Sequence, residues 1–176
     1  IQSQGTSEIV LAFTGPGDVW MDNFYLYDPT KPKFELRAEA KQQLVDFSPG
    51  WIRSHTGHTD ATWGSTMEDW TNEDALAQNQ FANGGGRTRP EQPYHLPFML
   101  QLAKDSGANP WLIVGSYMSE QEWANFMEYL AGPAGTPYGD KRIAQRGGNT
   151  TPWTTEFPRL RIEYGNEMWN PTFEWG

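Results

Sequence analysis

The chain changes its pattern of apolar and polar residues near residue 33. Before that point, residues 9–13 and 19–27 are rich in aromatic and β-branched side chains, and a Gly-Pro-Gly cluster at residues 15–17 lies between them. Such a pattern predicts two strands joined by a turn. Because an isolated hairpin is only marginally stable, we expect this one to belong to a larger sheet. We interpret residues 1–32 as the end of a β-sandwich, carbohydrate-binding-like module followed by a Pro-containing linker.

Beyond residue 33, helical spacing of apolar residues alternates with short apolar runs. The pattern predicts helices over residues 34–47, 68–82 and 94–105, a helix that opens at Ser119, and strands over residues 51–54, 111–115 and 159–165. The Gly-, Pro- and Asn-rich residues 132–158 are interpreted as an irregular excursion. Strands separated by helices favour an α/β fold of parallel β/α units, whose functional groups gather where the strands end.

These units predict the front half of a (β/α)₈ TIM barrel in residues 33–176. A complete barrel typically has about 250 residues, and this chain has 176. The chain opens on Ile1 without an initiator Met or a signal peptide. We therefore expect it to be part of a longer protein.

The helix that opens at Ser119 has the clearest terminal signal. Glu122 follows Ser119 at the spacing of a capping box. Apolar residues at helical spacing predict the buried stripe of this helix: Trp123, Phe126, Met127 and Leu130.

Composition narrows the possible partners. Aromatic residues make up 14% of the sequence and charged residues 20%, which excludes a disordered chain. Flat rings stack on the C–H faces of sugars, so a carbohydrate partner fits, although core packing accounts for many of these rings. The formal net charge of −9 disfavours nucleic acids and anionic membranes. No apolar run approaches the about 20 residues of a membrane span.

The strongest chemical signal is the pair Asn166-Glu167, which directly follows the strand pattern of residues 159–165. The carboxyl end of a strand is where barrel enzymes carry their catalytic groups. Glycoside cleavage needs one carboxylic acid that protonates the leaving oxygen and a second carboxylate that stabilises or traps the oxocarbenium-like centre. An apolar wall, either Trp169 or Tyr164, would raise the pKa of Glu167 and keep it protonated near neutrality. The alternative is that Glu167 only caps the next helix.

Residues 159–170 resemble the fourth strand of clan A glycoside hydrolases, particularly α-L-arabinofuranosidases and related uncharacterised (β/α)₈-barrel proteins. Further similarity runs through residues 94–104, 107–114, 129–133 and 136–142. The resemblance implies that Glu167 is the general acid/base and that Asn166 bonds the sugar 2-hydroxyl group. It also implies that residues 33–176 hold the first four β/α units, with residues 51–54 as the first strand. The nucleophile Glu, at the end of the seventh strand, would lie outside this chain.

Several side chains near the predicted strand ends are candidate substrate contacts. Arg53 ends the first predicted strand. The resemblance supports its contact with the sugar or with the nucleophile's carboxylate, and the alternative is an ordinary surface Arg. Trp63, in the loop after that strand, is a candidate stacking platform. Tyr117, just past the strand predicted over residues 111–115, which is counted as the third of the four strands, is a candidate to line the cleft. Trp169 is the fourth candidate contact.

His55 follows Arg53 closely and belongs to an H-x-x-H-x-D run with His58 and Asp60. Imidazole and carboxylate groups are suitable metal ligands. On an irregular loop, however, substrate contact by His55 or plain solvation is favoured, and we expect neither a metal nor a cofactor. Arabinofuranosidases usually carry Arg-x-Pro-Gly-Gly where this chain has Arg53-Ser54-His55-Thr56-Gly57, so the substrate class stays open.

Other candidates are better explained by structure. The second Asn-Glu pair, Asn72-Glu73, lies in an acidic stretch with a helical pattern. Trp70 is a possible stacking platform, whereas Trp111 begins an apolar strand and is assigned to the core. Glu163 would lie deep in the barrel, where a paired structural carboxylate is expected.

These observations predict a retaining glycoside hydrolase that acts on a plant or algal polysaccharide or oligosaccharide. The remaining half of the barrel is its expected partner, so this chain alone is expected to be inactive. The alternative is a non-catalytic carbohydrate-binding or extracellular structural protein. The absence of cysteine fits a secreted, cell-surface or periplasmic protein of bacterial type and also a cytoplasmic one.

Overall fold

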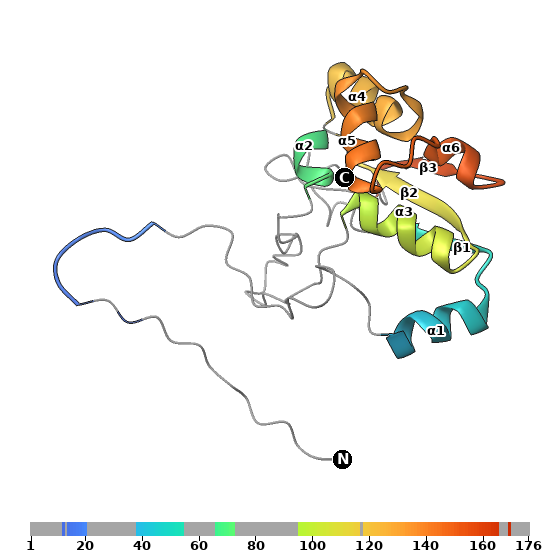
Figure 1. Ribbon diagram of the computed structural model, residues 1–176, viewed down its shortest axis with the longest axis horizontal. Helices are drawn as coiled ribbons and strands as arrows, with labels where there is room; N and C mark the ends of the chain where they lie inside the picture. The colour runs from blue at the N-terminus through green and yellow to red at the C-terminus, as the bar shows by residue number, and fades with distance from the viewer. Residues whose placement is uncertain are drawn as a thin grey trace, which may run out of the picture.

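The computed structural model describes residues 12, 14–20, 38–54, 66–72, 95–116, 118–165 and 169. Within these ranges the elements follow in the order α1 (Ala38–Phe47), β1 (Trp51–Ser54), α2 (Met67–Trp70), α3 (Leu96–Asp105), β2 (Asn109–Val114), α4 (Glu120–Ala131), α5 (Pro137–Gln145), α6 (Trp153–Glu156) and β3 (Arg161–Tyr164). Figure 1 shows the helices α3 to α6 gathered around the strands. None of these helices is long and apolar enough to cross a membrane.

The three strands form one parallel sheet in the order β1-β2-β3. Trp51 pairs with Asn109 across β1 and β2, and Trp111 pairs with Arg161 across β2 and β3. Parallel strands joined through helices confirm the α/β class. The strand count from the sequence needs correction, because it made β1 the first strand and β2 the third. Since β1 and β2 are hydrogen-bonded neighbours, no strand lies between them.

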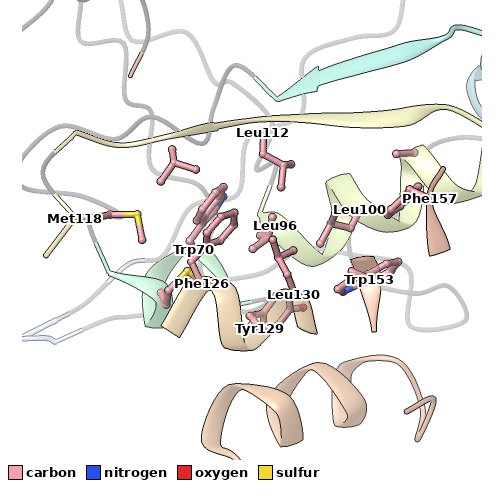
Figure 2. Close-up of a cluster of buried hydrophobic side chains, with 13 residues drawn as sticks. Trp70, Leu96, Leu100, Leu112, Met118, Phe126, Tyr129, Leu130, Trp153 and Phe157 are labelled. Atoms are coloured by element: carbon pink, nitrogen blue, oxygen red, sulfur yellow. The ribbon is translucent and has the colours of Figure 1, made fainter. Parts of the chain in front are cut away.

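Apolar residues on one side of β2 form the core with the helices. Leu112 and Val114 are fully buried and belong to a cluster with Leu100 of α3 and Phe126 of α4 (Figure 2). The Phe126 ring stacks on Trp70 at 5.2 Å between centroids. Burial of each such side chain stabilises the fold by about 1.5–3 kcal/mol. This side of the sheet, the helix side, is closed by residues of the chain itself.

Helix α4 begins as its sequence predicts. The Ser119 hydroxyl oxygen accepts a hydrogen bond from the Glu122 backbone N–H at 3.2 Å. The Glu122 carboxylate completes no reciprocal bond within the described residues. It accepts instead from the backbone N–H of Met67 at 2.6 Å. The capping residue is therefore confirmed, and its partner ties α2 to α4.

The buried stripe of α4 is confirmed for Phe126 and Leu130 but is wrong for Met127, which is 49% exposed. Tyr129 is buried in its place, because α5 packs on this side of α4. The Tyr129 hydroxyl donates to Gln145 Oε1 at 2.8 Å.

The irregular excursion expected over residues 132–158 is also wrong, because this segment holds α5 and α6. Pro137 lies in the first turn of α5, where a missing N–H costs nothing. Gly139 is required inside α5, since an added Cβ would lie 2.2 Å from the carbonyl oxygen of Pro133. The sequence pattern treats proline and glycine as turn residues, whereas Pro137 and Gly139 are part of helix α5.

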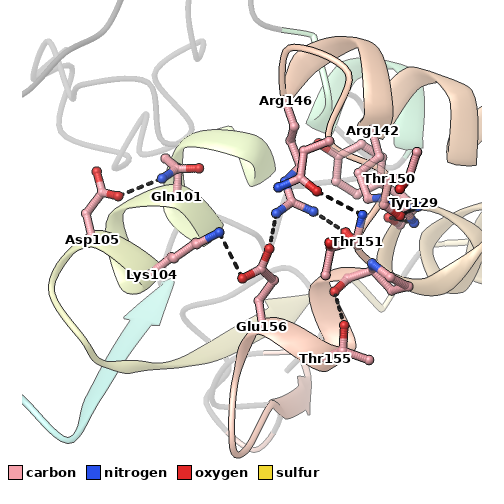
Figure 3. A network of polar contacts seen from close by, with 12 residues as sticks. Gln101, Lys104, Asp105, Tyr129, Arg142, Arg146, Thr150, Thr151, Thr155 and Glu156 are labelled. Carbon is pink, nitrogen blue, oxygen red and sulfur yellow. Dashed lines mark hydrogen bonds and ion pairs between the residues drawn. The ribbon is translucent and has the colours of Figure 1, made fainter.

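A polar cluster joins α3, α5 and α6. Glu156 pairs with Lys104 at 2.8 Å and with Arg146, whose guanidinium lies 3.9 Å from the Trp153 ring centroid (Figure 3). Hydrogen bonding from Lys104 and from Arg146 lowers the pKa of Glu156, although burial opposes the shift. The cluster therefore holds Glu156 ionised between the helices.

The remaining expectations are met in part. The helix expected over residues 34–47 is observed as α1, which buries none of its residues. The described part of the helix expected over residues 68–82 is α2, which ends at Trp70, and the carbonyl of Thr71 accepts from Gln145 Nε2 at 2.6 Å. Residues 73–82 lie outside the described residues.

Most of the expected hairpin also lies outside the described residues. Within residues 14–20 the chain bends at residues 15–17, and Gly15 has a φ of 116°. Trp20 is 92% exposed. The division into two domains stays a prediction.

Candidate functional site

The side of the sheet away from the helices carries charged and aromatic side chains. We call Trp51, Arg53, Trp111, Arg161 and Glu163 the charged face. The Arg53 guanidinium lies 5.3 Å from the Trp111 ring centroid, and that of Arg161 lies 4.6 Å from Trp111 and 4.7 Å from Trp51. Successive residues of a strand point to opposite sides of a sheet, so these residues and the core residues share strands but not sides.

Arg53 and Glu163 form a bidentate ion pair across the sheet. Arg53 Nε donates to Glu163 Oε2 at 2.9 Å, and Nη2 donates to Oε1 at 2.8 Å. About a third of each side chain is exposed. The planar fork of an Arg matches a carboxylate in this geometry and is stronger than a single contact. The pair confirms the expected structural role of Glu163 and links β1 to β3 over β2.

The carboxyl end of β3 is fixed to that of β2. The backbone N–H of Gly165 donates to the carbonyl of Val114 at 2.8 Å, and the Tyr164 hydroxyl donates to the carbonyl of Ser116 at 3.2 Å. Gly165 has a φ of 66°, a conformation that favours glycine, so the strand direction ends there. Asn166 and Glu167 follow directly in the sequence.

The structure places only some of the predicted site residues. Asn166, Glu167, His55, Trp63 and Tyr117 lie outside the described residues. Their roles stay predictions. The described residues include Arg53, which contacts Glu163, and Trp169, which is 79% exposed.

Two aromatic assignments change. Tyr164 was one of two candidate walls for Glu167, but its ring stacks on Trp123 of α4 at 6.2 Å, on the helix side. Because Glu167 lies outside the described residues, the role of Tyr164 as an apolar wall beside it stays a prediction. Trp111 was assigned to the core, yet it is only half-buried and lies on the charged face. Trp70 is 5% exposed in the core and is not a stacking platform.

Arg161 was not singled out from the sequence. The signal was present, because Arg161 and Glu163 alternate with apolar Ile162 along one strand. Charged residues in alternate positions of a strand indicate that one side of the sheet is polar.

The described residues contain no candidate metal site. Within the described ranges, no group of three or more His, Asp or Glu side chains could hold a metal ion. The run at residues 55–60 lies outside those ranges.

The fold is similar to part of solved glycoside hydrolases. The structure of an α-L-arabinofuranosidase from Thermotoga maritima in complex with arabinose matches with a TM-score of 0.58 and 15% identity, over 85% of this chain and 30% of that chain. The structure of a family 51 α-L-arabinofuranosidase from Bifidobacterium longum matches with a TM-score of 0.57 and 17% identity, over 84% of this chain and 28% of that chain. No protein-family model and no curated protein sequence matches the chain.

The chain therefore has the fold of a portion of these glycosidases, and it spans less than a third of their length. The resemblance to clan A arabinofuranosidases is confirmed at the level of fold. Identities this low carry the fold alone, because one fold hosts many activities.

Proposed function

We propose that this chain is part of a retaining glycoside hydrolase in which Glu167 is the general acid/base and Asn166 bonds the sugar 2-hydroxyl group. One observation carries the proposal: the pair Asn166-Glu167 directly follows Gly165, where a parallel strand ends beside its neighbour. Catalytic groups of barrel enzymes stand at such strand ends. The likeness to two solved arabinofuranosidases supports the same reading.

The sheet order supports a revised count of the barrel strands. If β3 is the fourth strand, as the sequence resemblance implies, then β2 is the third and β1 the second. Under this count, the first strand of the barrel lies outside the described residues.

The register bears on the proposed role of Arg53. Arg53 is level with Arg161, which lies three residues before the end of β3 at Tyr164. At about 3.3 Å per residue, the backbone of Arg53 lies roughly 10 Å below that strand end. We therefore infer that Arg53 serves the site by fixing Glu163 and β3, and that Trp63, Tyr117, Trp169 and His55 stay the candidates for substrate contact.

The complete enzyme would act on a plant or algal polysaccharide or oligosaccharide, with a nucleophile Glu outside this chain and no cofactor. The two neighbours are α-L-arabinofuranosidases by name. Aryl α-L-arabinofuranosides are therefore the first substrates to test. The chain of 176 residues alone should hydrolyse none of them.

The proposal is tested by the variant Glu167→Gln in the complete protein. The amide keeps the shape of the site but has no proton to transfer, so turnover of glycosides with poor leaving groups should fall by roughly 10² to 10⁴. Glu73→Gln is the matched control, because it changes the carboxylate of the other Asn-Glu pair, and it should retain full turnover. Equal effects of the two substitutions would refute the assignment.

A further inference from the structure

The proposed acid/base pair follows in the sequence on the carboxyl end of β3. Tyr164 is the last residue of this strand, and Gly165 separates it from Asn166. Glycine restricts its own backbone less than any other residue, and Gly165 has a φ of 66°. The direction in which the chain continues beyond β3 therefore depends on the contacts that hold the strand end.

Within the described residues, two hydrogen bonds hold this strand end to β2 at different heights. The backbone N–H of Gly165 donates to the carbonyl of Val114, which is level with Tyr164 in the sheet register. The Tyr164 hydroxyl donates to the carbonyl of Ser116 at 3.2 Å, two residues further along the chain than Val114. The side chain of Tyr164 therefore reaches forward, beyond the last register pair of the two strands.

The acceptor of the Tyr164 hydroxyl is anchored to the core. Ser116 lies in a turn in which the backbone N–H of Met118 donates to the carbonyl of Gly115 at 3.4 Å. Met118 is buried and belongs to the hydrophobic cluster. The Ser116 carbonyl is thus a fixed point beside β3, and a hydrogen bond to it restrains the strand end.

The ring of Tyr164 rests on the helix layer. It stacks on Trp123 at 6.2 Å between centroids, and Trp123 meets the buried ring of Phe126 edge-on at 5.9 Å. Tyr164 is nevertheless 58% exposed, so its burial adds little to the core. The hydroxyl is the group that distinguishes Tyr164 from an apolar residue at this place, and its bond links β3 to the anchored turn.

We propose that Tyr164 is a positioning residue for the acid/base. Through the hydrogen bond of its hydroxyl to Ser116, it holds the end of β3 in the orientation from which Glu167 protonates the leaving oxygen. Glu167 follows Tyr164 by three residues, and a misplacement of about 1 Å can lower the rate of a reaction by roughly 10²-fold. The inference rests on the proposed function and deepens it by naming the side chain that orients its acid.

The test is Tyr164→Phe in the complete protein, because this change removes the hydroxyl and keeps the ring. For methyl α-L-arabinofuranoside, whose poor leaving group needs a well-placed acid, kcat/KM should fall roughly tenfold. For a nitrophenyl α-L-arabinofuranoside, which needs little acid help, kcat/KM should fall by less than about threefold. The midpoint of thermal unfolding should shift by less than about 2 °C, because the lost bond is exposed.

Tyr129→Phe is the matched control. It removes the hydroxyl that donates to Gln145 Oε1 at 2.8 Å, a bond between α4 and α5 that lies apart from the strand ends. Because Tyr129 is fully buried, this variant should lower the midpoint of thermal unfolding by about 2 to 5 °C. At temperatures well below the midpoint, it should leave kcat/KM for both glycosides unchanged.

The dependence on the leaving group separates positioning from a loss of structure. A fall in kcat/KM that is equal for the two glycosides, or no fall in Tyr164→Phe, would overturn the proposal; in the second case only the ring could act, as an apolar wall. Glu167→Gln is measured beside it. If Glu167→Gln is impaired while Tyr164→Phe is not, this inference fails and the proposed function stands. If Glu167→Gln is unimpaired, both fail.

Discussion

The two sides of one short sheet differ in how they are completed. On the helix side, Leu112 and Val114 are fully buried by residues of α3 and α4. On the charged face, Trp111 of β2 is half-buried, and its register partner on β3, Arg161, is exposed. The described helices therefore cover one side of the sheet. The other side leaves Arg161 exposed and Trp111 half-buried within the described residues.

The largest effect should come from the helix side. Phe126→Ala removes a fully buried ring that stacks on Trp70, so the free energy of unfolding of the complete protein should fall by about 3–5 kcal/mol. Met127→Ala, at the next residue of α4, should cost less than about 1 kcal/mol because Met127 is half-exposed. Denaturant unfolding measures both. If the two variants lost similar amounts of unfolding free energy, the side of α4 that carries Phe126 would not face the core.

The same contrast explains what the sequence could predict. The strands β1, β2 and β3 and the N-cap Ser119 were recognised because apolar runs and capping residues act locally. Helix α5 was missed, because Gly139 meets a close approach of Pro133 that only the folded chain shows.

For a related reason, the sequence predicted some features of the candidate site and not others. The position of Asn166-Glu167 after a strand is a local signal, and the strand is confirmed. The partner of Arg53 is not local: Glu163 lies on β3, and only the sheet register brings the two together. The orientation of Tyr164 toward Trp123 likewise depends on which side of β3 the helices cover.

A smaller effect is expected on the charged face. In a double-mutant cycle, Arg53→Leu and Glu163→Leu should show a coupling energy of about 1 kcal/mol, because the pair is bidentate and only a third exposed. The pair of Lys141 and Glu68 is the control, with a coupling close to zero because Glu68 is 70% exposed. Urea unfolding of the four variants of each cycle measures both couplings. If the Arg53 cycle gives no more coupling than the Lys141 cycle, the charged face has no defined pairing.

The smallest effect depends on pH and concerns Glu156 on the helix side. The pKa of Glu156 is lowered in the folded protein, first by its hydrogen bond with Lys104, so its ionised form stabilises the fold. That contribution is present above the ordinary Glu pKa of 4.5 and is lost as the pH falls through the lowered value. Glu156→Gln should therefore reduce the free energy of unfolding by about 1 kcal/mol at pH 7 and by progressively less below pH 4.5.

Glu120→Gln is the control for this profile, since Glu120 is exposed at the start of α4. Its substitution should cost less than Glu156→Gln at pH 7, because substitutions of exposed residues usually change the free energy of unfolding by less than about 0.5 kcal/mol. A difference between wild type and Glu156→Gln that is constant from pH 7 to pH 3 would contradict the ionised cluster.

The central claim, that Glu167 is the acid/base of a retaining glycosidase, is tested most directly by azide rescue of Glu167→Gln in the complete protein. An aryl α-L-arabinofuranoside with an activated leaving group needs little acid help, so the first step survives and the covalent intermediate accumulates. Azide attacks that intermediate without deprotonation. We expect azide to restore turnover and to give a glycosyl azide of retained configuration, identified by NMR. Turnover that azide leaves unchanged, or a product of inverted configuration, would contradict it.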